Sequence, residues 1–198
     1  MTALPSEEIM EYNVYDFDKT IYLKDSTTDF YFYCLRRYPS ILAEVPITGA
    51  YFALYNLKRC SKTIFKEKMY RFLRHLPDVD QLVLDFWEEH KGNMASYYKK
   101  VQRPDDIIIS ASPEFLLEPI AKIMGFGTLM ASRVDKKSGI YDGINCHGKE
   151  KVRRLKERFP DAVVNRFYSD SFSDTPLAVI AKEAFLVKDG KPVPWPWK

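Results

Sequence analysis

The chain has 198 residues, of which 46% are hydrophobic, 29% charged and 15% aromatic. This composition excludes a disordered chain, and the length suits one α/β domain with a sizeable insertion or two small domains. The formal net charge of +3 comes without a concentrated basic block, apart from basic residues at 58–74 that we expect on the solvated face of a helix. The charge pattern therefore argues against a nucleic-acid partner.

Cysteine usage and the apolar segments bear on the cellular environment. The cysteines are odd in number and lack CxxC spacing, which predicts neither a disulfide framework nor a zinc ribbon and favours a reducing cytoplasmic location. Residues 1–12 are acidic and lack the features of a secretory signal. The apolar stretch 41–57 is interrupted by polar residues and is too short to span a bilayer. Surface association with a membrane stays open, and no pattern indicates an oligomeric state.

The first expected element is a short buried strand over residues 12–18, which ends on two aspartates. Helical periodicity then predicts an insertion from about residue 21 to residue 101. An α/β alternation follows, with a small hairpin-like excursion marked by Ser138-Gly139 and Asp142-Gly143. The proline-rich tail 192–197 is predicted to lack regular structure. The alternating segments are strands over 106–110, 128–133, 163–169 and 184–187, and helices over 114–124, 149–158 and 174–184.

Polar side chains follow several of these strands. Asp16 and Asp18 stand one residue apart at a strand end, where one carboxylate can attack while its neighbour handles protons. Alone, the pattern also fits a turn in which Thr20 caps a helix. Further polar groups follow in chain order, and open α/β sheets place their sites at strand ends. These groups are Ser110 with Ala111 and Ser112, Lys149 and Lys151 at a helix start, and Asp170 and Asp174 after the fourth strand.

In this order the segments resemble the four motifs of the haloacid dehalogenase superfamily, over about residues 12–187. The closer likeness is to its subfamily IB, which contains phosphoserine phosphatase and inserts a helical cap after the first motif. The runs SASPEF from Ser110, CHGKEKV from Cys146 and SDSFSDTP from Ser169 carry it. The resemblance implies an α/β fold, with a Rossmann-like core of parallel strands over residues 1–20 and 103–198. The helical cap would span residues 21–102.

The resemblance also implies the chemistry of a phosphoric monoester hydrolase. A carboxylate nucleophile is repelled by a phosphate dianion, so a hard cation such as Mg²⁺ is expected between them. The expected catalytic residues are Asp16 as nucleophile, Asp18 as general acid and base, Ser110 and Lys151. Phosphate would contact Thr20, Ala111 and Ser112, and the metal would be held by Asp16, Asp18 through its carbonyl oxygen, Asp170 and Asp174.

Lys151 is preferred to Lys149 because an apolar residue, Leu155, follows it by one helical turn, as in the family. Two positions depart from the family pattern. Lys19 stands where glycine is usual, and Ser169 replaces the glycine that opens the acidic loop, which is compatible with a negative φ. His147 is expected to be a loop histidine rather than a metal ligand or a proton shuttle.

The expected substrate is a small phosphate monoester such as phosphoserine. Asp25 matches the acidic residue that contacts the substrate amine in phosphoserine phosphatases, but it equally fits a helix N-cap. Aromatic residues of the predicted cap are expected mainly in its core. The alternatives are a lipid-phosphate or phospholipid-headgroup phosphatase at the membrane face, admitting lipid past residues 41–57, a phosphotransferase, or a catalytically weak phosphate-binding module.

Overall fold

The computed structural model describes residues 10–197, so residues 1–9, which form most of the acidic N-terminal segment, lie outside the described residues. A six-stranded sheet has the order β3-β2-β1-β4-β5-β6, in which only β6 runs antiparallel to its neighbour. The α/β fold is therefore confirmed. The strands are β1 (Glu11–Tyr15), β2 (Ile107–Pro113), β3 (Thr128–Ser132), β4 (Val163–Ser169), β5 (Ala181–Lys188) and β6 (Lys191–Pro194).

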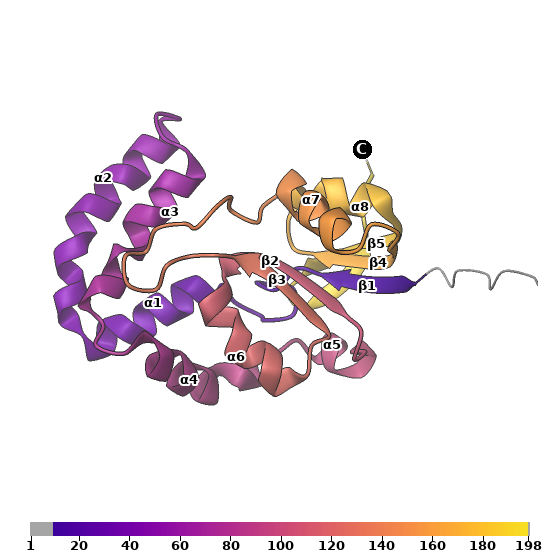
Figure 1. The fold of residues 1–198 in the computed structure, drawn as a ribbon, viewed down its shortest axis with the longest axis horizontal. Helices are drawn as coiled ribbons and strands as arrows, with labels where there is room; N and C mark the ends of the chain where they lie inside the picture. The colour runs from indigo at the N-terminus through magenta and orange to yellow at the C-terminus, as the bar shows by residue number, and fades with distance from the viewer. Residues whose placement is uncertain (1–9, 198) are drawn as a thin grey trace, which may run out of the picture.

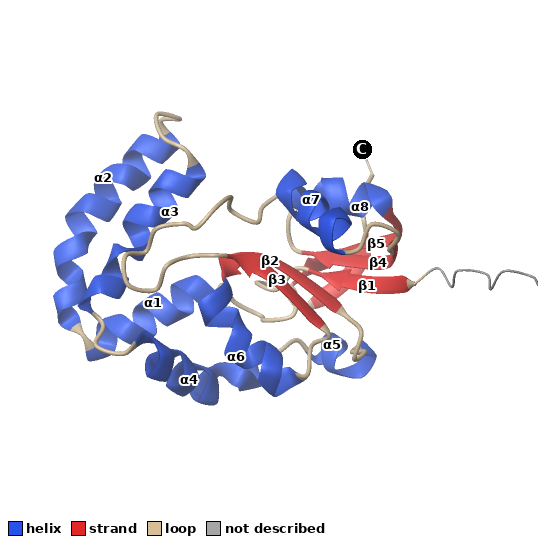
Figure 2. Cartoon of the chain, viewed as in Figure 1, coloured by secondary structure: helices blue, strands red, loops and turns tan. Residues whose placement is uncertain are grey.

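Helices cover both faces of the sheet. Figure 2 shows α7 (Lys149–Arg158) and α8 (Thr175–Ile180) on one side, and α6 (Glu114–Met124) with α5 (Ser96–Val101) on the other. Central strands buried on both faces need continuous apolar runs. Ile107, Ile108 and Ile109 of β2 supply such a run, and all three are fully buried.

The C-terminal tail corrects one prediction from the sequence. It was expected to be irregular, but β6 pairs with β5 along the register from Phe185–Pro194 to Lys188–Lys191. Proline is tolerated on an edge strand because its missing N–H is not needed by a further neighbour. Trp195, which is 4% exposed, then packs its ring against Phe167 of β4. The tail thus closes the edge of the apolar core.

The boundary between α8 and β5 is a second correction. The helix was expected to continue to residue 184, but it ends at Ile180, and β5 begins at Ala181 opposite Val164. Pairing with β4 extends along β5 from Ala181 to Leu186 and supplies backbone hydrogen bonds there. This pairing outweighs the short helical pattern of the sequence.

The insertion after β1 is helical, as expected, and divides into two parts in space. Figure 1 shows α2 and α3 as a hairpin that stands away from the sheet, whereas α4 lies beside α6. Trp87 of α4 is fully buried, and its Nε1 donates to the Leu116 carbonyl of α6 at 2.6 Å. The helices are α1 (Ser26–Arg37), α2 (Val45–Asn56), α3 (Lys62–Tyr70), α4 (Val79–His90) and α5, with 3₁₀ turns η1 (Pro39–Glu44), η2 (Arg71–His75) and η3 (Lys91–Asn93).

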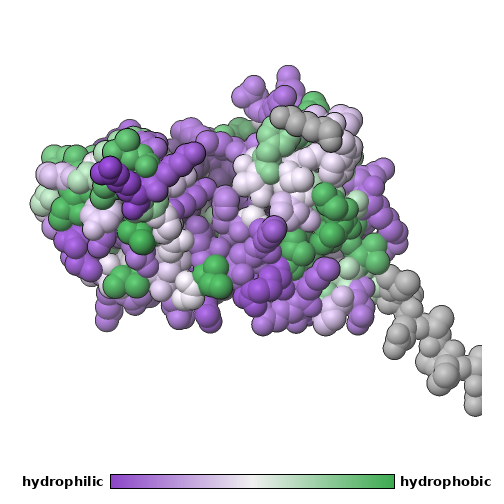
Figure 3. All heavy atoms as spheres, turned by 90° about the horizontal axis from the view of Figure 1, so that it is seen from above, coloured by the Kyte–Doolittle hydropathy of each residue, from purple (hydrophilic) through white to green (hydrophobic). Residues whose placement is uncertain are grey.

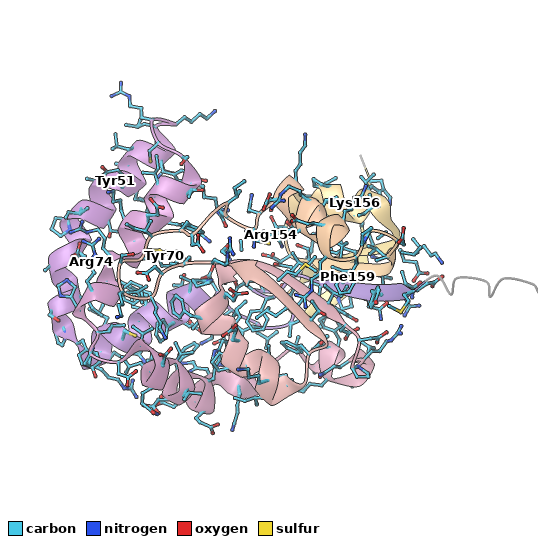
Figure 4. The ribbon with its side chains drawn as sticks, viewed as in Figure 1. Tyr51, Tyr70, Arg74, Arg154, Lys156 and Phe159 are labelled. Atoms are coloured by element: carbon cyan, nitrogen blue, oxygen red, sulfur yellow. The ribbon has the colours of Figure 1, made fainter. Side chains whose placement is uncertain are left out.

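The segment between β3 and α7 connects the sheet to this insertion. Its backbone pairs Val134 with Tyr141 in an antiparallel bridge, which matches the expected hairpin-like excursion. The Tyr141 ring lies 6.0 Å from that of Tyr70, and Arg74 donates to the Ser138 carbonyl at 3.3 Å. Figure 4 shows Tyr70 and Arg74 on the insertion, beside the segment between β3 and α7. The excursion therefore holds the end of α3 beside the sheet.

Candidate active site

The strand ends bring the predicted polar residues to one edge of the sheet. Asp16 directly follows β1, and its N–H donates to the Tyr168 carbonyl of β4 at 2.9 Å. Asp174 ends the 3₁₀ turn η4 (Phe172–Asp174) after β4. Lys151 lies in the first turn of α7, which begins after Gly148 with a φ of 60°. Segments far apart in the sequence thus meet at the carboxyl ends of parallel strands.

Lys151 forms the centre of this arrangement. Its Nζ lies 2.7 Å from Oδ1 of Asp16 and 2.6 Å from Oδ2 of Asp174, and only 2% of its side chain is exposed. Ser169 adds a hydrogen bond of 2.8 Å to the same oxygen of Asp174. The sequence preference for Lys151 agrees with this placement, since Lys149 is exposed.

Burial and charge oppose one another within this group. Burial favours the neutral amine of Lys151, but attraction to Asp16 and Asp174 outweighs it and raises the lysine pKa, so Lys151 stays cationic. Burial raises the pKa of Asp16 to about 7, and Lys151 limits that rise. The ionised form of Asp16 is therefore stabilised by the charge of Lys151.

Asp18 has a different environment from Asp16. Its Oδ1 accepts a hydrogen bond from the Ser26 N–H at 2.7 Å, and its Oδ2 accepts one from the Ser112 hydroxyl. Burial, followed by repulsion from Asp25, raises the pKa of Asp18 to about 6. A carboxyl group with a pKa near neutrality is suited to both giving and accepting a proton.

The predicted phosphate-binding residues take two kinds of position. Ala111 and Ser112 line a cavity of about 420 Å³ together with Asp16, Asp18 and Lys151. Ser110 and Thr20 are buried and do not line it. The Ser110 hydroxyl instead accepts the Ser112 N–H at 3.1 Å, which shapes the turn after β2. Contact of Ser110 and Thr20 with phosphate stays a prediction.

Four residues of α3 that the sequence did not assign to the site border this cavity: Lys62, Phe65, Lys66 and Met69. The Lys66 amine donates to the Ala111 carbonyl at 3.3 Å, and Lys62 Nζ lies 3.1 Å from Nε2 of His147. We expected these lysines on a solvated face, but the pair points toward the strand ends. Residues three or four positions apart lie on one face of a helix, so the spacing of Lys62, Phe65, Lys66 and Met69 could have indicated that they share one surface.

Asp25 caps α1, because its side chain accepts the Thr28 N–H at 2.8 Å. The N-cap interpretation is thus confirmed, and Asp25 also lines the cavity. Lys19 has a φ of 56°, a left-handed conformation that favours glycine. Ser169 lies in β4 without positive φ, so its side chain is accommodated. Burial raises the pKa of Asp170, which lines the cavity, and Lys19 opposes that rise.

Comparison with known proteins identifies the family. The sequence profile of the haloacid dehalogenase-like hydrolases matches residues 14–178. The chain belongs to this family. Among curated proteins, Protein CicA of Caulobacter vibrioides is 37% identical over 93 residues, which are 43% of this chain and 42% of that protein. The aligned part therefore spans less than half of the relative.

Several solved structures have a similar fold. A protein of unknown function from Bordetella pertussis Tohama I superimposes with a TM-score of 0.71 at 19% identity, covering 90% of both chains. A phosphoserine phosphohydrolase-like protein from Francisella tularensis gives 0.55 at 15% identity, covering 89% of this chain and 87% of its own. At such identities the likeness shows a common fold.

The buried lysine leads to a prediction about stability. Lys151→Met should lower the free energy of unfolding by about 3–5 kcal/mol at pH 7, because two buried carboxylates lose their counter-charge. Urea denaturation followed by circular dichroism measures the loss. Lys149→Met is the matched control and should leave the free energy almost unchanged, since its side chain is exposed. Equal losses in the two variants would contradict this account of the site.

Proposed function

We propose that this hydrolase is a magnesium-dependent phosphomonoesterase that acts through a phospho-aspartate formed on Asp16. The observation that carries the proposal is the buried ion pair between Lys151 and Asp16 on the wall of a cavity that Asp18 also lines. One carboxylate beside a fixed cation and a second with a pKa near neutrality are the groups that double displacement at phosphorus requires.

In the first step, a carboxylate oxygen of Asp16 attacks phosphorus, and the bond from phosphorus to the ester oxygen breaks. Asp18 protonates the departing oxygen. In the second step, water attacks phosphorus, Asp18 removes its proton, and inorganic phosphate leaves while the Asp16 carboxylate is restored. Contacts from Ser26 and Ser112 hold Asp18 in place, and Lys151 offsets the charge that Asp16 and the phosphoryl oxygens share.

The residues present fit a magnesium ion. Asp16, Asp170 and Asp174 line one cavity, and Oδ1 of Asp174 is buried without a hydrogen-bond partner among the described residues. No three acidic, histidine or cysteine side chains in residues 10–197 converge as a ready-made cluster. Magnesium suits this arrangement because it keeps several waters and needs few carboxylates. When bound, it would screen the phosphate from the charge of Asp16.

The substrate we propose is a small phosphorylated metabolite whose leaving group carries an acidic group, such as phosphoserine. Lys66 and Lys62 contact the Ala111 carbonyl and His147, and the ion pairs among the described residues include neither lysine. No carboxylate in residues 10–197 therefore neutralises their charge, which can attract an anion in the cavity. Asp25 lines the same cavity and would favour a neighbouring amine. Cytoplasmic location accords with such a substrate and stays a prediction.

We retain the division into a core of residues 1–20 and 103–198 and a cap of residues 21–102 as part of this proposal. In it, α3 is the part of the cap that covers the phosphate site and contacts the leaving group. A lipid-phosphate substrate is the second candidate, favoured by the exposed apolar helix α2, in which no residue is buried.

Metal removal tests the reaction class. EDTA should abolish hydrolysis of an aryl phosphate, and added magnesium should restore it, because Asp16 and the phosphate repel one another without a cation. Release of nitrophenol measures the rate in steady state. Calcium, which favours longer bonds and more ligands, should restore it poorly. Full activity in metal-free protein would exclude the proposed mechanism.

Substitutions on α3 test the substrate class. Replacing Lys62 and Lys66 together with glutamine should raise KM for phosphoserine about ten-fold or more, since a charged hydrogen bond is worth roughly 1.5–3 kcal/mol. KM for an aryl phosphate, whose leaving group carries no acidic group, should change little. Lys68→Gln is the matched control, because Lys68 lies over the Tyr51 ring, 5.1 Å from its centroid, and does not line the cavity. A similar rise in the double variant and in the control would refute this role.

A further inference from the structure

Helix α2 is apolar but unburied. It has no charged residue, and none of its residues is buried. Within a globular protein, a helix that is apolar all round is normally covered by other elements. Large exposed apolar patches mark surfaces that meet a partner or a membrane. Figure 3 shows hydrophobic residues at the surface of the end of the molecule that carries this insertion.

One face of α2 already has a partner. Phe52 and Tyr55 each place their rings 5.6 Å from the ring of Phe65 in α3, and Thr48 donates to the Lys68 carbonyl at 3.3 Å. Helical geometry puts Pro46, Ala50, Ala53 and Leu57 on the opposite side, with Ile47 on its flank. We call this side, with the turn that follows, the hairpin surface: Pro46, Ile47, Ala50, Ala53, Leu57, Lys58 and Arg59. Leu57 is 66% exposed.

The outer part of the hairpin, up to the second turn of α3, carries charge of one sign. Residues 45–66 contain no aspartate or glutamate, whereas Lys58, Arg59, Lys62 and Lys66 are basic. The exposed Lys58 and Arg59 stand at the tip, in a turn fixed by hydrogen bonds from their N–H groups to Tyr55 and Leu54. An apolar face next to ordered basic side chains is complementary to the interface of a bilayer, where anionic headgroups lie above apolar acyl chains.

We propose that the hairpin surface docks on the interface of an anionic lipid bilayer, with the outer face of α2 among the headgroups and the basic tip against their phosphates. The 12 residues of α2 extend about 18 Å, well short of a hydrocarbon core of about 30 Å. No helix in the described part of the chain could cross a membrane.

Docking would place the cavity near the lipid headgroups. Phe52 and Tyr55 contact one side of α3, while Lys62 and Lys66 of the same helix border the cavity. The hairpin surface and the candidate active site are therefore separated by the thickness of a helix pair. The proposal concerns binding and does not rest on the proposed phosphatase reaction.

Vesicle co-sedimentation of the full chain tests the proposal. The protein should pellet with phosphatidylcholine vesicles that contain phosphatidylglycerol and much less with phosphatidylcholine alone. Lys58→Gln with Arg59→Gln should weaken binding to the anionic vesicles by about 25-fold, because each basic residue near such a surface contributes about 1 kcal/mol, or roughly five-fold. Ile47→Ser with Leu57→Ser should weaken it at least ten-fold, as expected from about 0.8 kcal/mol per buried methylene.

Matched controls carry the same substitutions elsewhere. Leu84→Ser with Ile123→Ser removes apolar residues of similar exposure, and Lys122→Gln with Lys156→Gln removes two exposed charges. Both should bind vesicles as the unsubstituted chain does. Aryl phosphate hydrolysis and thermal denaturation, measured without vesicles, should be unchanged in every variant. Failure of the unsubstituted chain to bind, equal losses in hairpin and control variants, or lipid-free self-association abolished by Ile47→Ser with Leu57→Ser would overturn the proposal.

Discussion

A lysine with 2% of its side chain exposed must find opposite charge in the folded chain, because an unpaired buried ammonium costs several kcal/mol. Lys151 finds it on Asp16, which follows β1, and on Asp174, in the turn η4 that follows the adjacent parallel strand β4. Both ion pairs of Lys151 form only when β1, β4 and the start of α7 are correctly aligned. Folding and assembly of the site are thus coupled through one charge.

The same constraint explains how much could be predicted. Apolar runs such as Ile107 to Ile109 indicate buried strands, and carboxylates at strand ends indicate where they converge. Lys151 could be chosen over Lys149 because Leu155, one turn later, has to face the core, where it is 2% exposed. The alternation of strands and helices was therefore accessible from local patterns, and the group around Asp16 from those patterns together with the resemblance to the family.

Features that depend on distant pairing were not accessible. The tail forms β6 because β5 presents an open edge, which no pattern in a proline-rich segment indicates. Likewise, the position of Lys62 and Lys66 at the cavity depends on a contact far away in the sequence. The Tyr141 N–H, in the excursion after β3, donates to the Glu67 carboxylate of α3 at 3.2 Å and holds that helix beside the sheet. A basic helix face has the same sequence whether solvent or a cavity lies before it. The residues of α3 that border the cavity are hence the hardest to predict.

The central claim is that Asp16 carries the phosphoryl group while Asp18 handles protons. The most direct test is mass spectrometry of Asp18→Asn enzyme that is mixed with an aryl phosphate and magnesium and then quenched in acid. Because an activated leaving group needs little protonation whereas hydrolysis needs a base, the account predicts a phosphorylated peptide that carries the group on Asp16. Phosphate on Ser110, Ser112 or a histidine, or undiminished turnover in Asp16→Asn, would contradict it.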